Sequence, residues 1–399
     1  MNLRPLFVTG SLAHGGAERH SITLLNRLAE RGYDCHAVYI KDEAGQLERI
    51  RLRDDDKVHC LHAARFFDRR AIADFAAYIA RVRPSVLVAA NGYALLYASL
   101  ARLQAGLAIP VVVTFHTTQL INAKEHLKML LDRFFFWQAE RSIFVCDMQK
   151  RYWLRRGVGS RRNLVIHNGV DTEHFRDRST LAERRARRQS LGFAATDYVI
   201  GISAVLRPEK NHQQLINAVS TLRQMGIPAR LMMIGDGPLR AKLEAQAMRL
   251  QIADSVQITG YVEDVRPYLA ACDVTVLCSL SETFSLAALE GMAMGKPLIH
   301  SAVGGAAEMV FPGHNGYLFR PGDTGELVYR LLVLSHRQLA EEMGRAARQL
   351  VETSFSEAVM VDRYEKVLLD VCATHPDVAR ASALQTLGRA AGISEVQVK

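Results

Sequence analysis

Residues 274–300 read Val274-Thr-Val-Leu-Cys-Ser-Leu-Ser-Glu282-Thr-Phe-Ser-Leu-Ala-Ala-Leu-Glu290-Gly-Met-Ala-Met-Gly-Lys-Pro-Leu-Ile-His300. The short apolar runs at the two ends, 274–277 and 298–300, predict strands, and the segment between them predicts a helix. A strand, a helix and a second strand in this order are typical of a parallel sheet covered by helices.

The same alternation runs along most of the chain. Strands are expected at residues 6–8, 35–40, 86–89, 111–115, 142–145 and 164–166, and again at 198–202, 231–234, 256–258, 274–277 and 298–300. A charged stretch between the two series, residues 177–189, predicts a helix close to a domain boundary. Because 399 residues are enough for two domains, the pattern predicts two Rossmann-like parallel-sheet domains.

The composition is typical of a globular protein, with 49% hydrophobic residues and a formal net charge of +9. This charge suits an anionic partner, such as a phosphate ligand, a membrane surface or nucleic acid. No nucleic-acid-binding motif accompanies the charge, so a nucleic-acid partner is not expected. The six cysteines lie far apart, with no spacing typical of a zinc site, and we expect them to be reduced core thiols.

Two features argue against secretion or a membrane span. The N-terminus has too short an apolar run for a signal peptide. The longest apolar stretch, residues 86–103, is interrupted by Asn91-Gly92, which favours a strand, a turn and a helix. We therefore expect a cytoplasmic protein, or one bound peripherally to the inner face of the cell membrane.

Glu282 and Glu290 are the most specific candidates for ligand binding. Eight positions correspond to just over two helical turns, so the first can lie at the N-terminal end of a helix and the second deeper on nearly the same side. The segment between them is largely apolar. This pattern favours carboxylates held for a hydroxyl-bearing ligand, and ordinary exposed glutamates are the alternative.

Other candidates follow predicted strands, where open parallel sheets bind their ligands. Arg207 and Lys210 lie in a loop after the strand at 198–202 and could neutralise a leaving diphosphate, with a solvated turn as the alternative. His116 directly follows the strand at 111–115, although a lone histidine is often structural. Gly15 and Gly16 precede a predicted helix and could admit a phosphate, or could form a tight turn that needs a positive φ.

Taken together, these residues make the sequence resemble the retaining GT-B glycosyltransferases of family 4. The resemblance extends over nearly the whole chain and rests on Gly15-Gly16-Ala-Glu18, Val165-Ile-His-Asn168-Gly-Val-Asp171, the E-x7-E motif from Glu282 to Glu290, Gly304-Gly305-Ala-Ala-Glu308 and the helix after Phe355. It implies a hexosyltransferase-type enzyme that uses a UDP- or GDP-linked sugar, held in the cleft between two domains. The acceptor implied is a glycan or a lipid-linked molecule, as in polysaccharide or glycolipid biosynthesis.

The resemblance also implies a role for each candidate. Glu282 would contact hydroxyls of the donor sugar, together with amides near Phe284, Ser285 and Leu286. Glu290 would bind the ribose, His116 would position the donor sugar, and Lys210 would hold the diphosphate. Gly15 and Gly16 would approach the phosphate from the facing domain.

Two positions depart from the family pattern. Many members have an arginine five residues before the loop lysine, where this chain has Val205, so Arg207 is expected to reach the diphosphate instead. The chain also reads Glu282-Thr-Phe-Ser285 where the family often has a glycine-rich version. No Asp-x-Asp motif lies where a metal ion would bridge the diphosphate, so no metal and no further cofactor are expected.

The expected organisation is an N-terminal domain on the acceptor side (1–185), a nucleotide-sugar domain (186–354), a helix returning to the first domain (355–373) and a tail (374–399). Two other functions fit the same architecture: a sugar-nucleotide 2-epimerase, and a non-catalytic protein that binds nucleotide sugars or glycans. The E-x7-E motif with the following Gly-Gly-Ala-Ala-Glu argues against the epimerase, and the complete set of candidate residues argues against a binding protein.

An anionic membrane surface is a further expected partner. Cations and aromatic residues are combined in one predicted helix and in the segment that follows it: Lys124, Lys128, Arg133, Phe134, Phe135, Phe136 and Trp137, and then Lys150-Arg-Tyr-Trp-Leu-Arg-Arg156. Such a surface could rest on lipid while a lipid-linked acceptor enters. The alternative is that the aromatic residues belong to the core and the cations to a solvated face.

Overall fold

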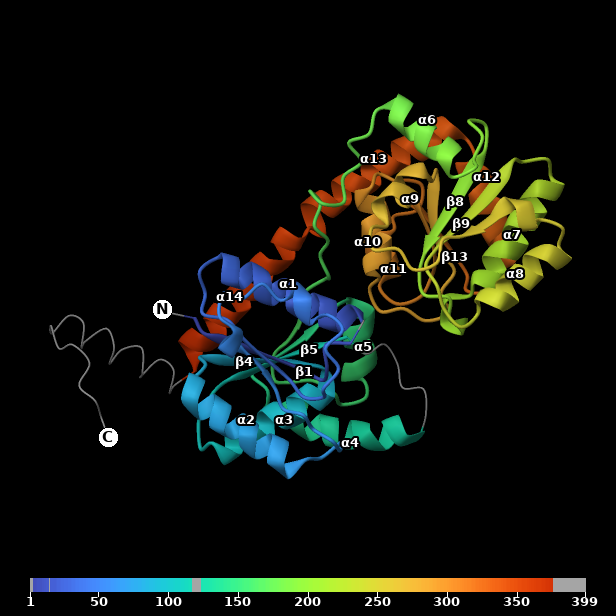
Figure 1. The fold of residues 1–399 in the computed structure, drawn as a ribbon. Helices are drawn as coiled ribbons and strands as arrows, with labels where there is room; N and C mark the ends of the chain where they lie inside the picture. Colours follow the sequence, from blue (N-terminus) through green and yellow to red (C-terminus); the bar gives the residue numbers. More distant parts are fainter. Residues whose placement is uncertain (1–2, 14, 117–122, 376–399) are drawn as a thin grey trace. The chain divides into compact units, whose positions relative to one another are not determined.

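The computed structural model describes residues 3–13, 15–116 and 123–375. The chain divides into two compact units (Figure 1). Unit 1 contains Met1–Ile166 and the chain from Val361, and unit 2 contains His167–Met360. The predicted boundary at residue 185 falls within a helix of unit 2, α6 (Leu181–Ser190).

Unit 1 contains a seven-stranded sheet in which every pairing is parallel, in the order β3-β2-β1-β4-β5-β6-β7. Its strands are β1 (Pro5–Thr9), β2 (His36–Tyr39), β3 (Val58–Cys60), β4 (Val86–Ala90), β5 (Val111–Phe115), β6 (Arg141–Phe144) and β7 (Asn163–Val165). The central strands β1, β4 and β5 are buried along their whole length, as expected for a parallel sheet with helices on both faces.

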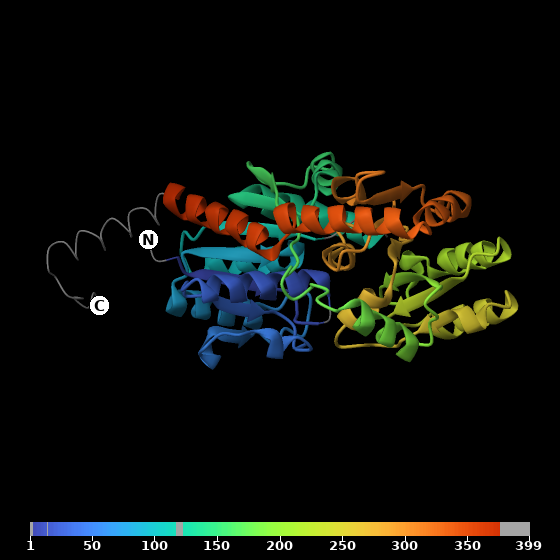
Figure 2. The ribbon, with the colours of Figure 1, turned by 90° about the horizontal axis from the view of Figure 1, so that it is seen from above.

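Helices cover both faces of this sheet. They are α1 (Gly16–Glu30), α2 (Arg69–Val82), α3 (Asn91–Gln104), α4 (Ala123–Gln138), α5 (Asp147–Leu154) and, from Val361, α14 (Glu357–Thr374). In Figure 1, α1 and α14 lie on one face, and α2 and α3 lie on the other. Figure 2 shows α14 alongside α1, where Arg31 forms ion pairs with Asp362 and Glu365.

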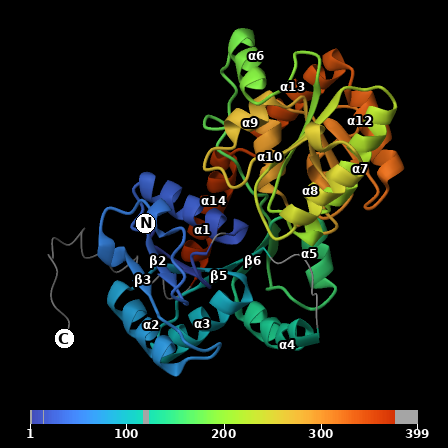
Figure 3. The same ribbon diagram turned by 45° about the vertical axis from the view of Figure 1, so that its right-hand side comes forward.

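Unit 2 contains a six-stranded parallel sheet in the order β10-β9-β8-β11-β12-β13. Its strands are β8 (Tyr198–Ser203), β9 (Ala229–Ile234), β10 (Val256–Ile258), β11 (Val274–Leu277), β12 (Leu298–Ser301) and β13 (Gly316–Phe319). Its helices, besides α6, are α7 (His212–Gln224), α8 (Arg240–Arg249), α9 (Arg266–Ala271), α10 (Leu286–Ala293), α11 (Ala306–Met309), α12 (Thr324–Leu334) and α13 (Arg337–Ser354). Figure 3 shows α7, α8 and α12 on one face of the sheet and α9 and α10 on the other.

The two predicted parallel sheets are therefore confirmed. The helix expected at 177–189 is α6, which starts at a capping box: the Thr180 side chain accepts a hydrogen bond from the Glu183 backbone, and the Glu183 side chain accepts one from the Thr180 backbone. Two strands had not been predicted, β3 and β13, and both are short strands at sheet edges.

All six cysteines are free, as expected, and all but Cys60 are buried.

The stretch at residues 86–103 forms β4 and most of α3, as predicted, and Asn91 turns the chain between them with a φ of 67°. Among the helices of the described residues, none combines the length and the apolar character needed to cross a bilayer.

Candidate functional site

The chain order of each sheet reverses at one point, and open parallel sheets bind ligands outside the carboxyl ends of the strands at such a point. In unit 2 this point lies between β8 and β11, which are neighbours in the sheet although β9 and β10 intervene in sequence. The loop after β8 contains Arg207 and Lys210, and the loop after β11 contains Glu282. The fold thus brings three of the predicted residues to one edge of one sheet.

Lys210 and Glu282 form an ion pair between Nζ and Oε1. The Ser279 hydroxyl also donates to Glu282 Oε1, at 3.3 Å. The two loops are joined directly as well, because the Leu280 N–H donates to the Glu209 carbonyl at 2.8 Å. The side chains of Lys210 and Glu282 remain 23% and 14% exposed, so a ligand can reach both charges.

The position of Lys210 follows from the local backbone. Residues Pro208–Lys210 form a short 3-10 turn, and Asn211 ends it in the left-handed conformation with a φ of 52°. Asparagine tolerates this conformation better than most residues, and the helix α7 begins immediately afterwards. Lys210 is therefore fixed between a turn and a helix.

Gly304 supports the Glu282 loop from the strand beside it. It follows β12 with a φ of 56°, and a Cβ atom at this position would lie 2.2 Å from the Glu282 carbonyl oxygen. The next residue, Gly305, donates its N–H to the Thr283 carbonyl at 2.7 Å. Only glycine allows this approach, so the Gly304-Gly305 turn fixes the backbone that carries Glu282.

Helix α10 begins at Leu286, four residues after Glu282, which we had predicted to lie at the N-terminal end of this helix. Ser285 is its N-cap, because the Ser285 hydroxyl accepts from the Ala288 N–H at 3.3 Å. Glu282 consequently precedes the helix. The prediction that the two glutamates lie on nearly the same side of one helix is therefore wrong. Glu290 lies in the second turn of α10 and is only 5% exposed.

The start of α10 offers backbone donors. Among the described residues, no protein acceptor is recorded for the N–H groups of Phe284, Ser285 and Leu286. The Phe284 carbonyl is held by the side-chain amide of Asn168 at 2.9 Å. A helix N-terminus carries partial positive charge, so these amides can receive an anionic or hydroxyl oxygen.

Arg207 is exposed, and its side chain forms no ion pair within the described part of the chain. Its carbonyl accepts from the Lys210 N–H at 3.1 Å, so it belongs to the same turn. Val205, where the family pattern has arginine, is 47% exposed. The expected contact of Arg207 with a diphosphate remains a prediction.

Two buried histidines lie next to the Lys210–Glu282 pair, and neither had been predicted. Burial, and secondarily the charge of Lys210, lowers the pKa of His212 to about 4. Burial also lowers the pKa of His300, and the charge of Glu282 partly opposes this shift. His300 Nδ1 donates to the Ser301 carbonyl at 2.7 Å. Both rings are therefore neutral at pH 7, and His300 could have been found from its position at the end of β12.

In unit 1, Gly15 and Gly16 form the start of α1, with Gly15 as the N-cap at a φ of −152°. Neither glycine has a positive φ, so the tight-turn interpretation is wrong. Both residues are exposed, and a Cβ atom on Gly16 would meet no atom within 4 Å. The open backbone at a helix start is compatible with the phosphate interpretation.

His116 follows β5, and its N–H donates to the Asn91 side chain at 2.8 Å. Its ring lies 4.7 Å from that of His20, centroid to centroid, and His20 Nε2 lies 3.1 Å from the Tyr364 hydroxyl. Burial lowers the pKa of His116 to about 4, so the ring is neutral at pH 7. A neutral imidazole can orient a hydroxyl group by a hydrogen bond without adding charge.

The predicted residues thus form two groups, each within its own unit. Arg207, Lys210, Glu282, Glu290 and the start of α10 belong to unit 2, and Gly15, Gly16 and His116 belong to unit 1. The unit 2 group combines two cations, two carboxylates and backbone donors. This chemistry suits a ligand that carries both phosphate and hydroxyl groups.

Two family models match the chain, one in each half. The model for Glycosyltransferase Family 4 matches residues 14–174, and the model for Glycosyl transferases group 1 matches residues 183–350.

Curated relatives match about half of the chain. The putative glycosyltransferase EpsD of Bacillus subtilis is 31% identical over 205 residues, which are 51% of this chain and 53% of EpsD. The N-acetyl-alpha-D-glucosaminyl L-malate synthase of Bacillus anthracis is 30% identical over 210 residues, with 52% and 53% coverage. The chain therefore spans about half the length of the curated relatives it matches.

Solved structures share the fold over almost the whole chain. HepE of Anabaena in complex with UDP has a TM-score of 0.81 at 22% identity, covering 92% of this chain and 100% of that structure. HepE in complex with UDP-glucose has a TM-score of 0.78 at 22% identity, with the same coverage.

Proposed function

We propose that the chain transfers a hexose from a nucleotide sugar to a glycan or lipid-linked acceptor. The two family matches and the fold support a glycosyltransferase of the family 4 type with GT-B architecture. A UDP-linked donor is the first candidate, since HepE was solved with UDP and with UDP-glucose, and a GDP-linked donor is the second. Polysaccharide or glycolipid assembly is the corresponding pathway class.

The observation that carries the proposal is the Lys210–Glu282 pair at the carboxyl ends of β8 and β11. On donor binding, Lys210 would turn from Glu282 to the diphosphate, and Glu282 would accept hydrogen bonds from hydroxyls of the sugar. The amides of Phe284, Ser285 and Leu286, at the start of α10, would donate to the same ligand. Glu290, buried in α10, would accept from the ribose hydroxyls.

The chemistry we propose is transfer with retention of the anomeric configuration. The bond between the sugar and the diphosphate breaks, and the acceptor oxygen bonds to the same face of the sugar. A phosphate oxygen of the donor accepts the acceptor proton, so no separate nucleophile is required. The protein contributes mainly orientation of the donor and stabilisation of the departing negative charge.

A panel of nucleotide sugars incubated with the purified chain tests this function. Release of the nucleoside diphosphate from one member, by slow hydrolysis without acceptor, is the expected result. Conversion of the sugar to its 2-epimer would identify an epimerase instead. Tight binding with no breakdown of any donor would identify a binding protein.

We further predict that donor breakdown does not need a metal ion. Lys210 and Arg207 can supply positive charge to the diphosphate, and no Asp-x-Asp motif lies near them. EDTA should leave the rate of nucleoside diphosphate release unchanged. The assignment of the cations would be wrong if EDTA abolished release and Mg²⁺ or Mn²⁺ restored it.

A membrane-facing surface is proposed on α4. Phe134 and Trp137 are 58% and 59% exposed, and Arg133 beside them is also exposed. Arg161 lies 5.4 Å from the centroid of the Trp137 ring. Exposed aromatic rings next to cations favour an anionic lipid surface.

Two aromatic residues of the predicted segments do not belong to this surface. Phe136 and Trp153 are buried in the core of unit 1, so the alternative interpretation holds for them. The side chains of Lys124 and Lys128 lie outside the described residues.

We predict that the protein co-floats with vesicles containing anionic phosphatidylglycerol at low salt, and that the Phe134→Ser/Trp137→Ser variant does not. Leu103→Ser is the control, because Leu103 is an apolar side chain of the same unit that is 77% exposed. This variant should float like the wild type. Equal flotation of all three proteins, or none with anionic vesicles, would contradict the proposal.

A further inference from the structure

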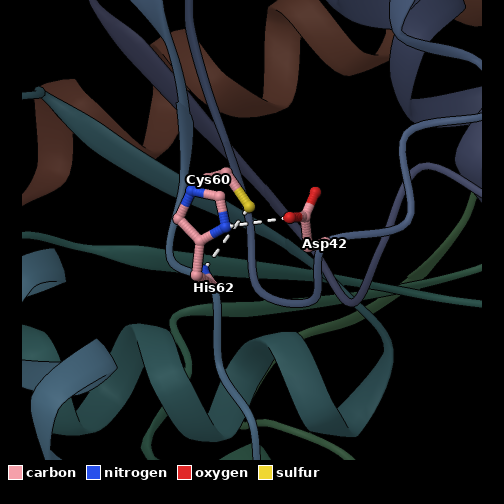
Figure 4. A group of neighbouring side chains, drawn as sticks. All are labelled: Asp42, Cys60 and His62. Atoms are coloured by element: carbon pink, nitrogen blue, oxygen red, sulfur yellow. Dashed lines mark hydrogen bonds and ion pairs between the residues drawn. The ribbon is translucent and has the colours of Figure 1, made fainter.

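Three side chains with metal-ligating atoms meet at the carboxyl ends of β2 and β3, and none of them is among the residues proposed to bind the donor (Figure 4). Asp42 follows β2, Cys60 is the last residue of β3, and His62 comes two positions later. The two strands are parallel neighbours with Tyr39 opposite Cys60, so the segments that follow them emerge side by side.

The geometry is close to that of a metal site. The carboxylate, thiol and imidazole ligand atoms all lie within 4.8 Å of one another. His62 Nδ1 and Asp42 Oδ2 are 3.1 Å apart, and the His62 N–H donates to Cys60 Sγ at 3.4 Å. Ligand atoms around a tetrahedral zinc ion are separated by about 3.3 to 3.6 Å, from metal–ligand bonds of about 2.0 to 2.3 Å. Small rotations of the exposed Asp42 and His62 side chains would therefore complete the geometry.

The backbone at His62 is unusual. Its φ of 47° lies in the left-handed region, which costs free energy for a residue other than glycine and persists where the surroundings impose it. In this conformation His62 makes two contacts: its ring bonds to the Asp42 carboxylate, and its backbone N–H donates to Cys60 Sγ.

A second group supports the sulfur. Tyr39, a residue that is 8% exposed, lies directly opposite Cys60 in the strand pairing, and its side chain interacts with that of Cys60. Metal ligands are commonly oriented by such outer partners, which tune their affinity. Cys60 is also the one cysteine of six that is not buried, so an ion from solvent can reach its sulfur atom.

We propose that Asp42, Cys60 and His62 bind Zn²⁺ or a similar divalent transition-metal ion. One sulfur, one nitrogen and one carboxylate oxygen suit such an ion better than Mg²⁺ or Ca²⁺. Three protein ligands leave a fourth position for water or an anionic ligand. Binding releases the thiol proton of Cys60 to solvent. None of the three ligands is among the residues proposed to bind the donor, so the site does not alter the expected resistance of donor breakdown to EDTA.

Cobalt titration of the EDTA-treated, dialysed full chain tests the site. We expect one Co²⁺ per chain, with a thiolate-to-cobalt charge-transfer band in the near ultraviolet that Zn²⁺ removes by displacement. Cys60→Ser should lose the band, and Asp42→Asn and His62→Gln should weaken binding. Tyr39→Phe should keep the band and lower the affinity by roughly tenfold or more, as expected for an outer partner.

His59→Gln is the matched control. His59 Nε2 also lies near a carboxylate, 2.7 Å from Asp74 Oδ2, but no cysteine accompanies that pair. The control should bind Co²⁺ like the wild type. No charge-transfer band in the wild type, or an equal band in Cys60→Ser, would overturn the proposal.

Thiol labelling gives a second readout that does not depend on a variant folding. An aromatic disulfide reagent should modify Cys60 first in the native chain, and Zn²⁺ should slow that reaction. Labelling of Cys60 at the same rate with and without Zn²⁺ would also overturn the proposal.

Discussion

Lys210→Ala is expected to lower turnover by roughly a hundredfold or more, with a smaller change in the Michaelis constant for the donor. The negative charge on the diphosphate grows as the bond to the sugar breaks, so a cation at this position interacts more strongly with the transition state than with the bound donor. Steady-state kinetics with the donor identified by the panel would measure the effect. Lys210→Arg should retain part of the activity because it keeps the charge.

Two comparisons separate this catalytic effect from loss of structure. Lys242→Ala, at an exposed lysine of α8 in the same unit, should have wild-type kinetics. The far-ultraviolet circular dichroism spectrum of Lys210→Ala should match the wild type, although the change leaves Glu282 without its ion-pair partner. A folded Lys210→Ala enzyme with normal turnover would remove Lys210 from the catalytic residues.

Glu290→Gln should act on binding instead. The ribose hydroxyls do not change charge during the reaction, so a hydrogen bond to them contributes similarly to the ground state and to the transition state. A hydrogen bond to a charged group contributes about 1.5 to 3 kcal/mol, so the Michaelis constant for the donor should rise roughly ten- to a hundredfold with a smaller effect on turnover.

Glu244→Gln on α8 is the matched control, since its side chain is 45% exposed and pairs with Arg240 at 3.0 Å. It should leave both kinetic constants unchanged. If Glu290→Gln lowered turnover and left the Michaelis constant unchanged, the proposed role in ribose binding would be wrong. Because Glu290 is buried, thermal unfolding of the variant should be measured alongside the kinetics.

The sequence predicted the sheets well because buried parallel strands produce continuous apolar runs. Strand β5 and strand β11 are examples, each buried from its first to its last residue. The pattern failed at β3 and β13, which lie at sheet edges and are only partly buried. The pattern did find two other short edge strands, β7 and β10, so it detects strands of this kind only in part.

Within the site, residue types were easier to predict than their geometry. Lys210 was found from the strand it follows and Glu282 from its spacing to Glu290, but their ion pair spans 72 positions and depends on β8 and β11 being neighbours. The expected helical relation of Glu282 to Glu290 failed because Ser285 caps α10 and the Gly304 contact fixes the preceding loop.

The group of Asp42, Cys60 and His62 was missed for a related reason. The sequence shows no standard zinc spacing, and Asp42 joins the other two only because β2 pairs with β3 in a particular register. Since β3 had not been predicted, nothing in the sequence pattern brought the two loops together.

The central claim is that unit 2 binds a nucleotide sugar at the ends of β8 and β11. Amide hydrogen exchange of the full chain, with and without a saturating concentration of the nucleoside diphosphate released in the panel, tests it most directly. We predict slower exchange in the loops at 204–212 and 278–290, with no change in the loops after β2 and β3. The claim would be contradicted if the nucleotide bound and exchange at 204–212 and 278–290 did not change. It would also be contradicted if the protection were confined to other segments.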